Sequence, residues 1–146
     1  MGDAILTSTL TIIGGVLIYV IGQILMKFFI DPVHRLTGHI GRITDSLVFY
    51  ANVYGNPGSL RIEETKKASD ELRKLASQLM AKTTVVSCYS FWSFLGVVPQ
   101  LSDISIIHSN LIGLSNGVFR TGDPGQNTER VEKIKAALRL PKELLR

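Results

Sequence analysis

The chain has 146 residues, of which 45% are hydrophobic and 19% are charged, and its formal net charge is +4. This length has room for one membrane span and one small helical domain. A single cysteine excludes an internal disulfide and fits a reducing compartment. The basic balance suits contact with an anionic partner, such as lipid headgroups, nucleic acid or nucleotides, unless it serves only to orient a membrane span.

Residues 4–26 form the most distinctive segment, because they carry no charge and are rich in Ile, Leu and Val. As a helix they reach about 35 Å, which is enough to cross the ~30 Å hydrocarbon layer of a bilayer. Lys27, Arg35 and Arg42 follow the segment, whereas no Lys or Arg precedes it. This asymmetry disfavours a cleaved signal peptide and predicts an N-terminus outside the cell and a cytoplasmic body. We therefore expect a single-pass protein of the cell inner membrane, with its transmembrane helix in 1–30 and a cytoplasmic helical domain in 31–146.

One face of the expected span carries small residues at helical spacing. This small-residue stripe comprises Ser8, Thr11, Gly15, Ile18 and Gly22. Small residues let helices approach closely in lipid, where apolar burial gives no drive to associate. The stripe thus predicts a span that self-associates, with the Thr7 and Thr11 hydroxyls turned toward a central pore. In the alternative, these hydroxyls bond the backbone carbonyls of their own helix, and the span is an isolated anchor.

The segment after the span has the pattern of a helix with one apolar seam. Asp31-Pro32 predicts a helix start, with Asp31 as the N-cap. Apolar residues then recur at alternating steps of three and four: Val33, Leu36, Ile40, Ile43, Leu47, Tyr50 and Tyr54. This seam packs either within the domain, which is the commoner case, or against the same helix of a neighbouring copy. In the second case, Leu36, Ile40, Ile43, Leu47 and Tyr50 would form an oligomer seam.

A turn at residues 55–58 predicts the start of a second helix, from about Ser59 to Lys82. Its buried face is expected to hold Thr65, Ala68, Leu72, Leu75 and Leu79. Its cations are candidate ligands for an anion: Arg61, Lys66, Lys67, Arg73 and Lys74, with Arg120 and Arg130 as outside candidates. The alternative is a solvated face, supported by the helical pairs Glu63–Lys67 and Asp70–Lys74.

Residues 83–119 hold only one charge, Asp103, and we expect them to form two core helices that meet near Pro99. An interfacial membrane hairpin, with Tyr89 and Trp92 at headgroup level, is the alternative. After a loop over 120–128, which lacks the spacing of a P-loop, a short amphipathic helix is predicted from about Thr128 to Leu140. Val131, Ile134 and Leu138 would face inward there.

No catalytic constellation is evident in the sequence. Cys88 and His108 are the only thiol and base that could pair, and the apolar run around Cys88 predicts a buried, inert thiol. His34 and His39 are five residues apart, on different faces of a helix, and Asp45 is a lone carboxylate. We therefore expect no enzyme activity, no cofactor and no metal site.

Two strings, 72–79 (LRKLASQL) and 111–116 (LIGLSN), resemble parts of a set of small bacterial membrane proteins. The overall plan of one N-terminal span and a small basic helical domain resembles the membrane effectors of anti-phage systems, those of the Hailong and type III CRISPR systems in particular. The resemblance implies a homo-oligomer, often a tetramer. Its cytoplasmic domain would sense a nucleotide or short oligonucleotide and gate a disruptive membrane pore.

Two functions are thus expected of this all-α chain. The first is an oligomeric membrane effector, a pore or channel in anti-phage defence controlled by an anionic nucleotide or oligonucleotide. Its partners would be the lipid bilayer, further copies of the chain and that ligand. The alternative is a membrane-tethered binding module or scaffold, which recruits a soluble partner and conducts nothing.

Overall fold

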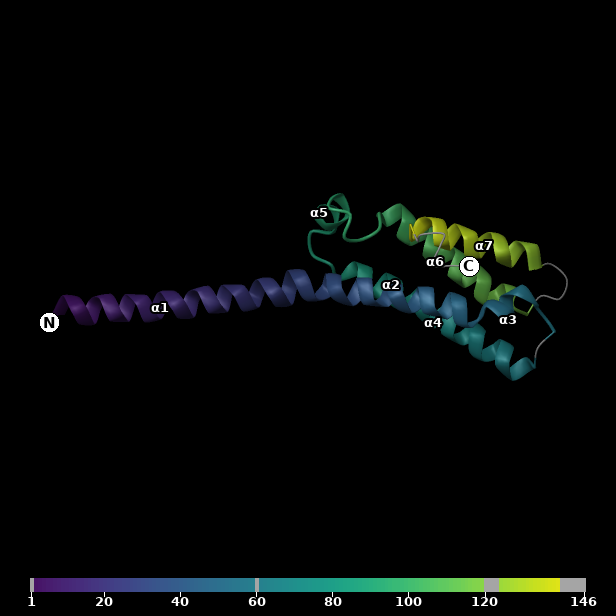
Figure 1. Cartoon of the computed structure of the whole chain (residues 1–146), viewed down its shortest axis with the longest axis horizontal. Helices are drawn as coiled ribbons and strands as arrows, with labels where there is room; N and C mark the ends of the chain where they lie inside the picture. The colour runs from purple at the N-terminus through teal and green to yellow at the C-terminus, as the bar shows by residue number, and fades with distance from the viewer. Residues whose placement is uncertain (1, 60, 120–123, 140–146) are drawn as a thin grey trace.

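The computed structural model describes residues 2–59, 61–119 and 124–139, and over these ranges it is all-helical, with no strand. The elements in order are α1 (Gly2–Leu25), the π-helix η1 (Met26–Ile30), α2 (Asp31–Phe49), α3 (Ala51–Gly55), α4 (Ile62–Thr84), α5 (Tyr89–Phe94), α6 (Leu101–Gly117) and α7 (Pro124–Ala137). Figure 1 shows a long rod that projects from a compact helical body.

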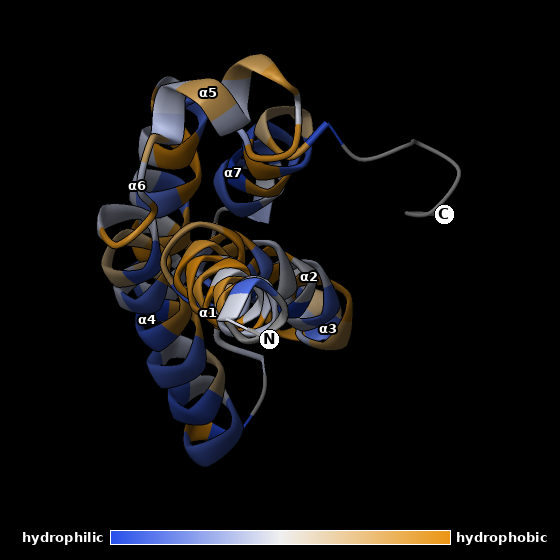
Figure 2. Ribbon diagram, turned by 90° about the vertical axis from the view of Figure 1, so that its left-hand side faces the viewer, coloured by the Kyte–Doolittle hydropathy of each residue, from blue (hydrophilic) through white to orange (hydrophobic). Residues whose placement is uncertain are grey.

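The rod consists of α1, η1 and α2, which follow one another without a break. The described side chains of α1 are exposed apart from the half-exposed Gly14, and no part of the body packs on them. Figure 2 views α1 end on and shows hydrophobic residues around its circumference. The chain therefore has one N-terminal helix that is long and apolar enough to cross a membrane. An apolar helix with no protein around it would be costly in water.

The body is built on α2, which packs against α4, while α6 packs against both α4 and α7. The core side chains from these four helices are Leu36, Ile43, Leu47, Leu72, Leu75, Leu79, Ile104, Ile107, Leu111, Leu114, Val131 and Ile134. All five residues expected on the buried face of the second helix are buried: Thr65, Ala68, Leu72, Leu75 and Leu79. The inward positions Val131 and Ile134 are also confirmed, and Leu138 packs against the same core.

The apolar seam after the span belongs to this core. Leu36, Ile43 and Leu47 are fully buried within the chain, and Ile40 and Tyr50 are partly buried against the two apolar clusters of the body. Their apolar surface is thus covered by the chain's own helices. In this conformation they do not form the oligomer seam, and internal packing, the commoner alternative, is the arrangement found.

The seam is also shorter than expected, because the helix ends before Tyr54. Tyr50 follows α2 with φ −93° and ψ 16°, outside the helical region, and the chain turns there into α3. Tyr54 folds back on the preceding helix and donates a hydrogen bond from its Oη to the Leu47 carbonyl at 2.8 Å. The predicted turn over 55–58 is present, with Gly58 at φ +77°, a conformation that favours glycine.

The apolar stretch 83–119 follows the expectation of two core helices only in its second half. α6 is a core helix, and it begins at Leu101. The first half contains only the six-residue α5, none of whose residues is fully buried. Glycine and proline shorten this segment, because Gly96 adopts φ +72° and Pro99 follows. The last helix begins earlier than expected, at Pro124.

Candidate functional site

The small-residue stripe lies on the open surface of α1. Ser8, Thr11, Gly15, Ile18 and Gly22 are all exposed, and a Cβ added at Gly15 or Gly22 would meet nothing within 4 Å. Thr11 donates a hydrogen bond to the Thr7 carbonyl at 2.9 Å, and Thr7 donates one to the Asp3 carbonyl at 2.8 Å. These are the bonds of the anchor alternative, although a hydroxyl oxygen that donates within its own helix can still accept from a neighbour.

The junction between rod and body is the π-helix η1. The Asp31 backbone N–H donates to the Met26 carbonyl, five residues back instead of four. Pro32 explains the widening, because proline lacks an N–H and its ring clashes with the carbonyl four residues earlier in an ordinary α-helix. Asp31 itself has helical backbone angles, φ −56° and ψ −43°. The predicted boundary at Asp31 is thus present, but Asp31 is not an N-cap, and the chain crosses the boundary without leaving the helix.

The five candidate ligand cations of α4 are exposed, but they do not share one face. Lys66 and Arg73 are seven residues apart and lie along one edge of the helix, and Lys67 and Lys74 lie along another, about 100° away. Arg61 precedes α4 with an extended backbone, φ −60° and ψ 141°. The helix also carries four acidic residues, Glu63, Glu64, Asp70 and Glu71. The surface is therefore mixed in charge, and Figure 2 shows that much of α4 is hydrophilic.

The helical ion pairs expected on α4 are not among those of the described residues. Neither Glu63–Lys67 nor Asp70–Lys74 comes within 4.0 Å, and the carboxylate of Glu71 instead reaches across to Arg42 of α2. Exposed i to i+4 pairs are worth only ~0.3–0.5 kcal/mol, so their absence costs the helix little. It leaves the ammonium groups of Lys67 and Lys74 without a nearby carboxylate partner.

Among the candidate cations of 61–74, Arg73 donates a side-chain hydrogen bond to another helix. Its Nη2 donates to Oδ1 of Asn116 at 2.7 Å, and one turn earlier Ser69 Oγ donates to the Ser115 carbonyl at 2.7 Å. The two resemblance strings, 72–79 on α4 and 111–116 on α6, therefore pack on each other. A packing role explains both strings without a ligand.

Arg130 is likewise part of the packing, on the α6–α7 contact. A Cβ on Gly113 would lie 2.7 Å from its Nε, and one on Gly117 would collide with Asn127. Two glycines four residues apart thus let α7 approach α6 closely, and Arg130 lies across them with hydrogen bonds to Gln126 and Asn127. Arg120, the other outside candidate, lies outside the described residues.

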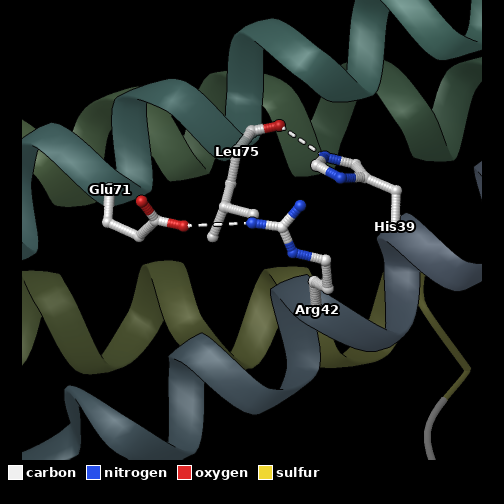
Figure 3. A network of polar contacts seen from close by, with 4 residues as sticks. All are labelled: His39, Arg42, Glu71 and Leu75. Carbon is white, nitrogen blue, oxygen red and sulfur yellow. Dashed lines mark hydrogen bonds and ion pairs between the residues drawn. The ribbon is translucent and has the colours of Figure 1, made fainter.

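Figure 3 shows a polar contact between α2 and α4 that sequence reasoning missed. His39 is buried, with its Nε2 at 2.9 Å from the Leu75 carbonyl, and Arg42 Nη2 lies 3.5 Å from Glu71 Oε1. Burial lowers the pKa of His39, and the nearby charges of Lys82 and Arg42 lower it further, against the raising effect of the Leu75 hydrogen bond. The imidazole is therefore held neutral. His39 lies between Leu36 and Ile43 in the apolar seam, and this position in the sequence could have predicted its burial.

The region around Cys88 differs from its expected burial. Cys88 is exposed and adopts φ +54°, so the prediction of a buried thiol is wrong. Tyr89 and Trp92 point inward: Tyr89 Oη donates to the Pro99 carbonyl at 2.8 Å, and Trp92 Nε1 donates to the Ser87 carbonyl at 3.1 Å. Burial, and secondarily the charge of Asp103, raise the pKa of Tyr89 to about 12. Both polar tips are thus bonded within the protein.

No site for chemistry emerges from this geometry. Over the described ranges, no group of three or more His, Cys, Asp and Glu side chains could hold a metal ion. A shallow groove of about 460 Å³ lies between the first turns of α2, the α5 region and the end of α7, lined in part by Thr37, Phe94 and Arg139. The chain matches no family model, no curated protein and no solved structure.

Proposed function

We propose that the protein is a membrane effector: several copies associate through α1 in the bilayer, and their cytoplasmic bodies control a pore between the spans. The observation that carries this proposal is the unbroken rod. A passive anchor needs only a flexible link to its cargo, whereas here the apolar helix is continuous with α2, whose side chains lie in the core of the body. Any rotation or tilt of the body is therefore transmitted to the span.

The π-helix supports control rather than simple anchoring. Single π-turns inside α-helices occur frequently at functional sites. In this chain the π-turn lies where the apolar helix meets the body, between Met26 and Ile30. It accommodates Pro32 within one continuous helix, so a rotation of the body about the axis of the rod is passed to the span.

The ligand we propose is an anionic nucleotide or short oligonucleotide on the cytoplasmic body. Lys67 and Lys74 supply cations without a carboxylate partner, and Lys66 and Arg61 are exposed nearby. One copy presents a surface of mixed charge, which binds a phosphate weakly. A closed oligomer repeats the same cations around its axis, so the assembly would bind much more strongly than the monomer. Arg73 would contribute only by giving up its bond to Asn116.

Two measurements test the proposal in sequence. The mass of the protein in mild detergent gives the number of copies, and a monomer at every concentration refutes the effector. Potassium flux from liposomes containing the purified protein is then measured with and without a pool of mononucleotides and short oligonucleotides. An absence of flux in both conditions refutes the pore. Replacement of Lys67 and Lys74 by Gln should abolish any nucleotide response but leave the number of copies unchanged, with Lys133→Gln on α7 as the matched control.

The second candidate is a membrane-tethered scaffold, favoured by the hydrogen bonds of Thr7 and Thr11 to their own helix. In that case α1 has no sequence-specific role. Replacing residues 4–26 with an unrelated Leu-rich helix of equal length should preserve function in the scaffold and abolish flux in the effector. A flexible Gly-Ser segment in place of 26–30 separates the two in the same way, because only the effector needs a rigid rod.

A further inference from the structure

The strongest unexplained feature of the body is an exposed apolar patch around α5. Phe94 is 86% exposed, Phe91 is 55% exposed, and four aliphatic side chains near them in the sequence are exposed as well. We call this the α5 patch: Val85, Phe91, Phe94, Leu95, Val97 and Leu101. No residue from 83 to 102 carries a charge. Contiguous exposed apolar surface of this kind marks an interaction site in a folded protein.

The patch is built to face outward. Two rings of α5 anchor it from within, because Tyr89 and Trp92 pack against the core and bond to the Pro99 and Ser87 carbonyls. These hydrogen bonds hold α5 in one orientation, and that orientation leaves Phe91 and Phe94 exposed. The alternative hairpin would place Tyr89 and Trp92 at headgroup level, whereas in the structure these two rings pack inward and Phe91 and Phe94 are exposed.

The position of α5 identifies what covers the patch. Figure 1 places α5 at the end of the body from which α1 projects, while α3 lies at the opposite end. Figure 2, viewed from the α1 side, shows α5 displaced sideways from the axis of α1. Phe94 and Thr37 line the same groove, which places α5 beside the first turns of α2. If α1 crosses a bilayer, the α5 patch stands over the surface of the same bilayer.

The apolar rod is longer than the hydrocarbon layer is thick, and this excess length brings the α5 patch closer to the membrane. Apolar residues continue past Lys27 through Phe28, Phe29 and Ile30, so the apolar stretch 4–30 is about 40 Å long. It exceeds the ~30 Å hydrocarbon layer, and a helix that is too long accommodates by tilting. A tilt toward the side of α5 lowers the patch into the headgroup region, where aromatic side chains partition well.

We propose that the α5 patch docks on the bilayer crossed by α1, with Phe91 and Phe94 inserted at the boundary between headgroups and acyl chains. This second contact fixes the direction in which the rod tilts and the rotation of the body about it. The inference rests on the membrane location in the proposed function, but not on self-association, ligand binding or conduction.

Trp92 is the only tryptophan of the chain and lies within α5, so its fluorescence reports directly on the patch. The full-length protein is reconstituted in phosphatidylcholine vesicles whose acyl chains are brominated at either shallow or deep positions. We expect shallow bromines to quench Trp92 more than deep ones. Phe91→Ser with Phe94→Ser should reduce this quenching by about half or more, since two large apolar anchors are lost. Phe49→Ser, at a phenylalanine 75% exposed at the far end of α2, is the matched control and should change nothing.

A second variant separates failure of docking from failure of membrane insertion. Tyr19→Trp with Trp92→Phe places the sole tryptophan in the middle of α1. If deep bromines do not quench that tryptophan, the membrane location itself is refuted. If they do quench it while shallow bromines leave native Trp92 unquenched, only the docking is refuted.

Discussion

The continuity of the rod predicts different outcomes for two single-residue deletions that look alike in the sequence. Deleting Val20 from the regular part of α1 rotates everything before it by about 100° and shortens the helix by about 1.5 Å. Deleting Met26 in a Pro32→Ala background shortens the rod as much, but it removes both the extra residue of the π-turn and the proline that opens it. The turn then closes as an ordinary α-helix, and the rotation between span and body is nearly unchanged.

The size of the effect follows from the small-residue stripe. In the Val20 deletion, Gly22 turns about 100° away from Ser8, Thr11 and Gly15, so the stripe no longer forms one face. Interhelical hydrogen bonds in lipid, of the kind open to Ser8 and Thr11, are worth ~1–2 kcal/mol in model peptides, and about 1.4 kcal/mol corresponds to a tenfold change in an equilibrium. We expect the Val20 deletion to change potassium flux from liposomes about tenfold or more. The Met26 deletion should stay within about twofold of the parent protein.

The assay uses whichever condition, with or without the nucleotide pool, gives flux for the parent protein. Both deletion proteins are compared at equal reconstitution density, and circular dichroism checks that the body stays folded. Equal flux from the two deletion proteins would mean that the rotation of the span relative to the body does not affect conduction. The rod would then not have its proposed role.

Three further predictions concern the body, each measured by unfolding in mild detergent. Leu72→Ala, at a fully buried core position, should cost about 2–5 kcal/mol, whereas Phe49→Ala on the exposed surface should stay within ~0.5 kcal/mol; similar losses would contradict the packing. Ser69→Ala removes the donor to a carbonyl at the end of α6 and should cost about 1–3 kcal/mol, because that buried carbonyl loses its partner; no loss would show that water replaces the hydroxyl. Because the pKa of His39 is lowered in the folded state, the unfolded chain binds the proton more tightly, so stability should fall as the pH drops below about 6.5. His39→Gln should flatten this fall, and an unchanged pH profile would refute the role of His39.

The sequence predicted the helical content and the core faces well, because these depend on apolar periodicity. The stripes on α4, α6 and α7 are read directly from the spacing of residues such as Leu72, Leu111 and Val131, which all lie in the core. Helix ends were less predictable. Asp31-Pro32 has the composition of a helix start, yet the preceding apolar helix runs through it by widening to a π-turn. A local signal cannot show that a longer helix overrides it.

The candidate sites were predicted less well, for two physical reasons. Periodicity shows that a face is apolar but not what covers it, so the seam containing Ile43 suited a second copy as well as α4. Exposed cations are equally ambiguous, and Arg73 turned out to bond Asn116, a partner 43 residues away. The outward orientation of Phe94 depends on the turns at Cys88 and Gly96, whose positive φ angles leave only a weak trace in sequence.

Because α2 directly follows the apolar helix, it is synthesised before the helices that cover it in the folded body. α2 emerges from the ribosome directly after the apolar helix, but its core partner α4 follows later, and α7 is complete only at Ala137. At the usual rate of synthesis, the 35 residues from Phe49 to Thr84, the end of α4, take roughly 2–7 s to appear. During that interval the apolar side of α2 has no partner within its own chain, and a neighbouring nascent chain can pair with it. Exchange of α2 between chains is therefore the misassembly that this order of elements favours, and it should increase with the rate of expression.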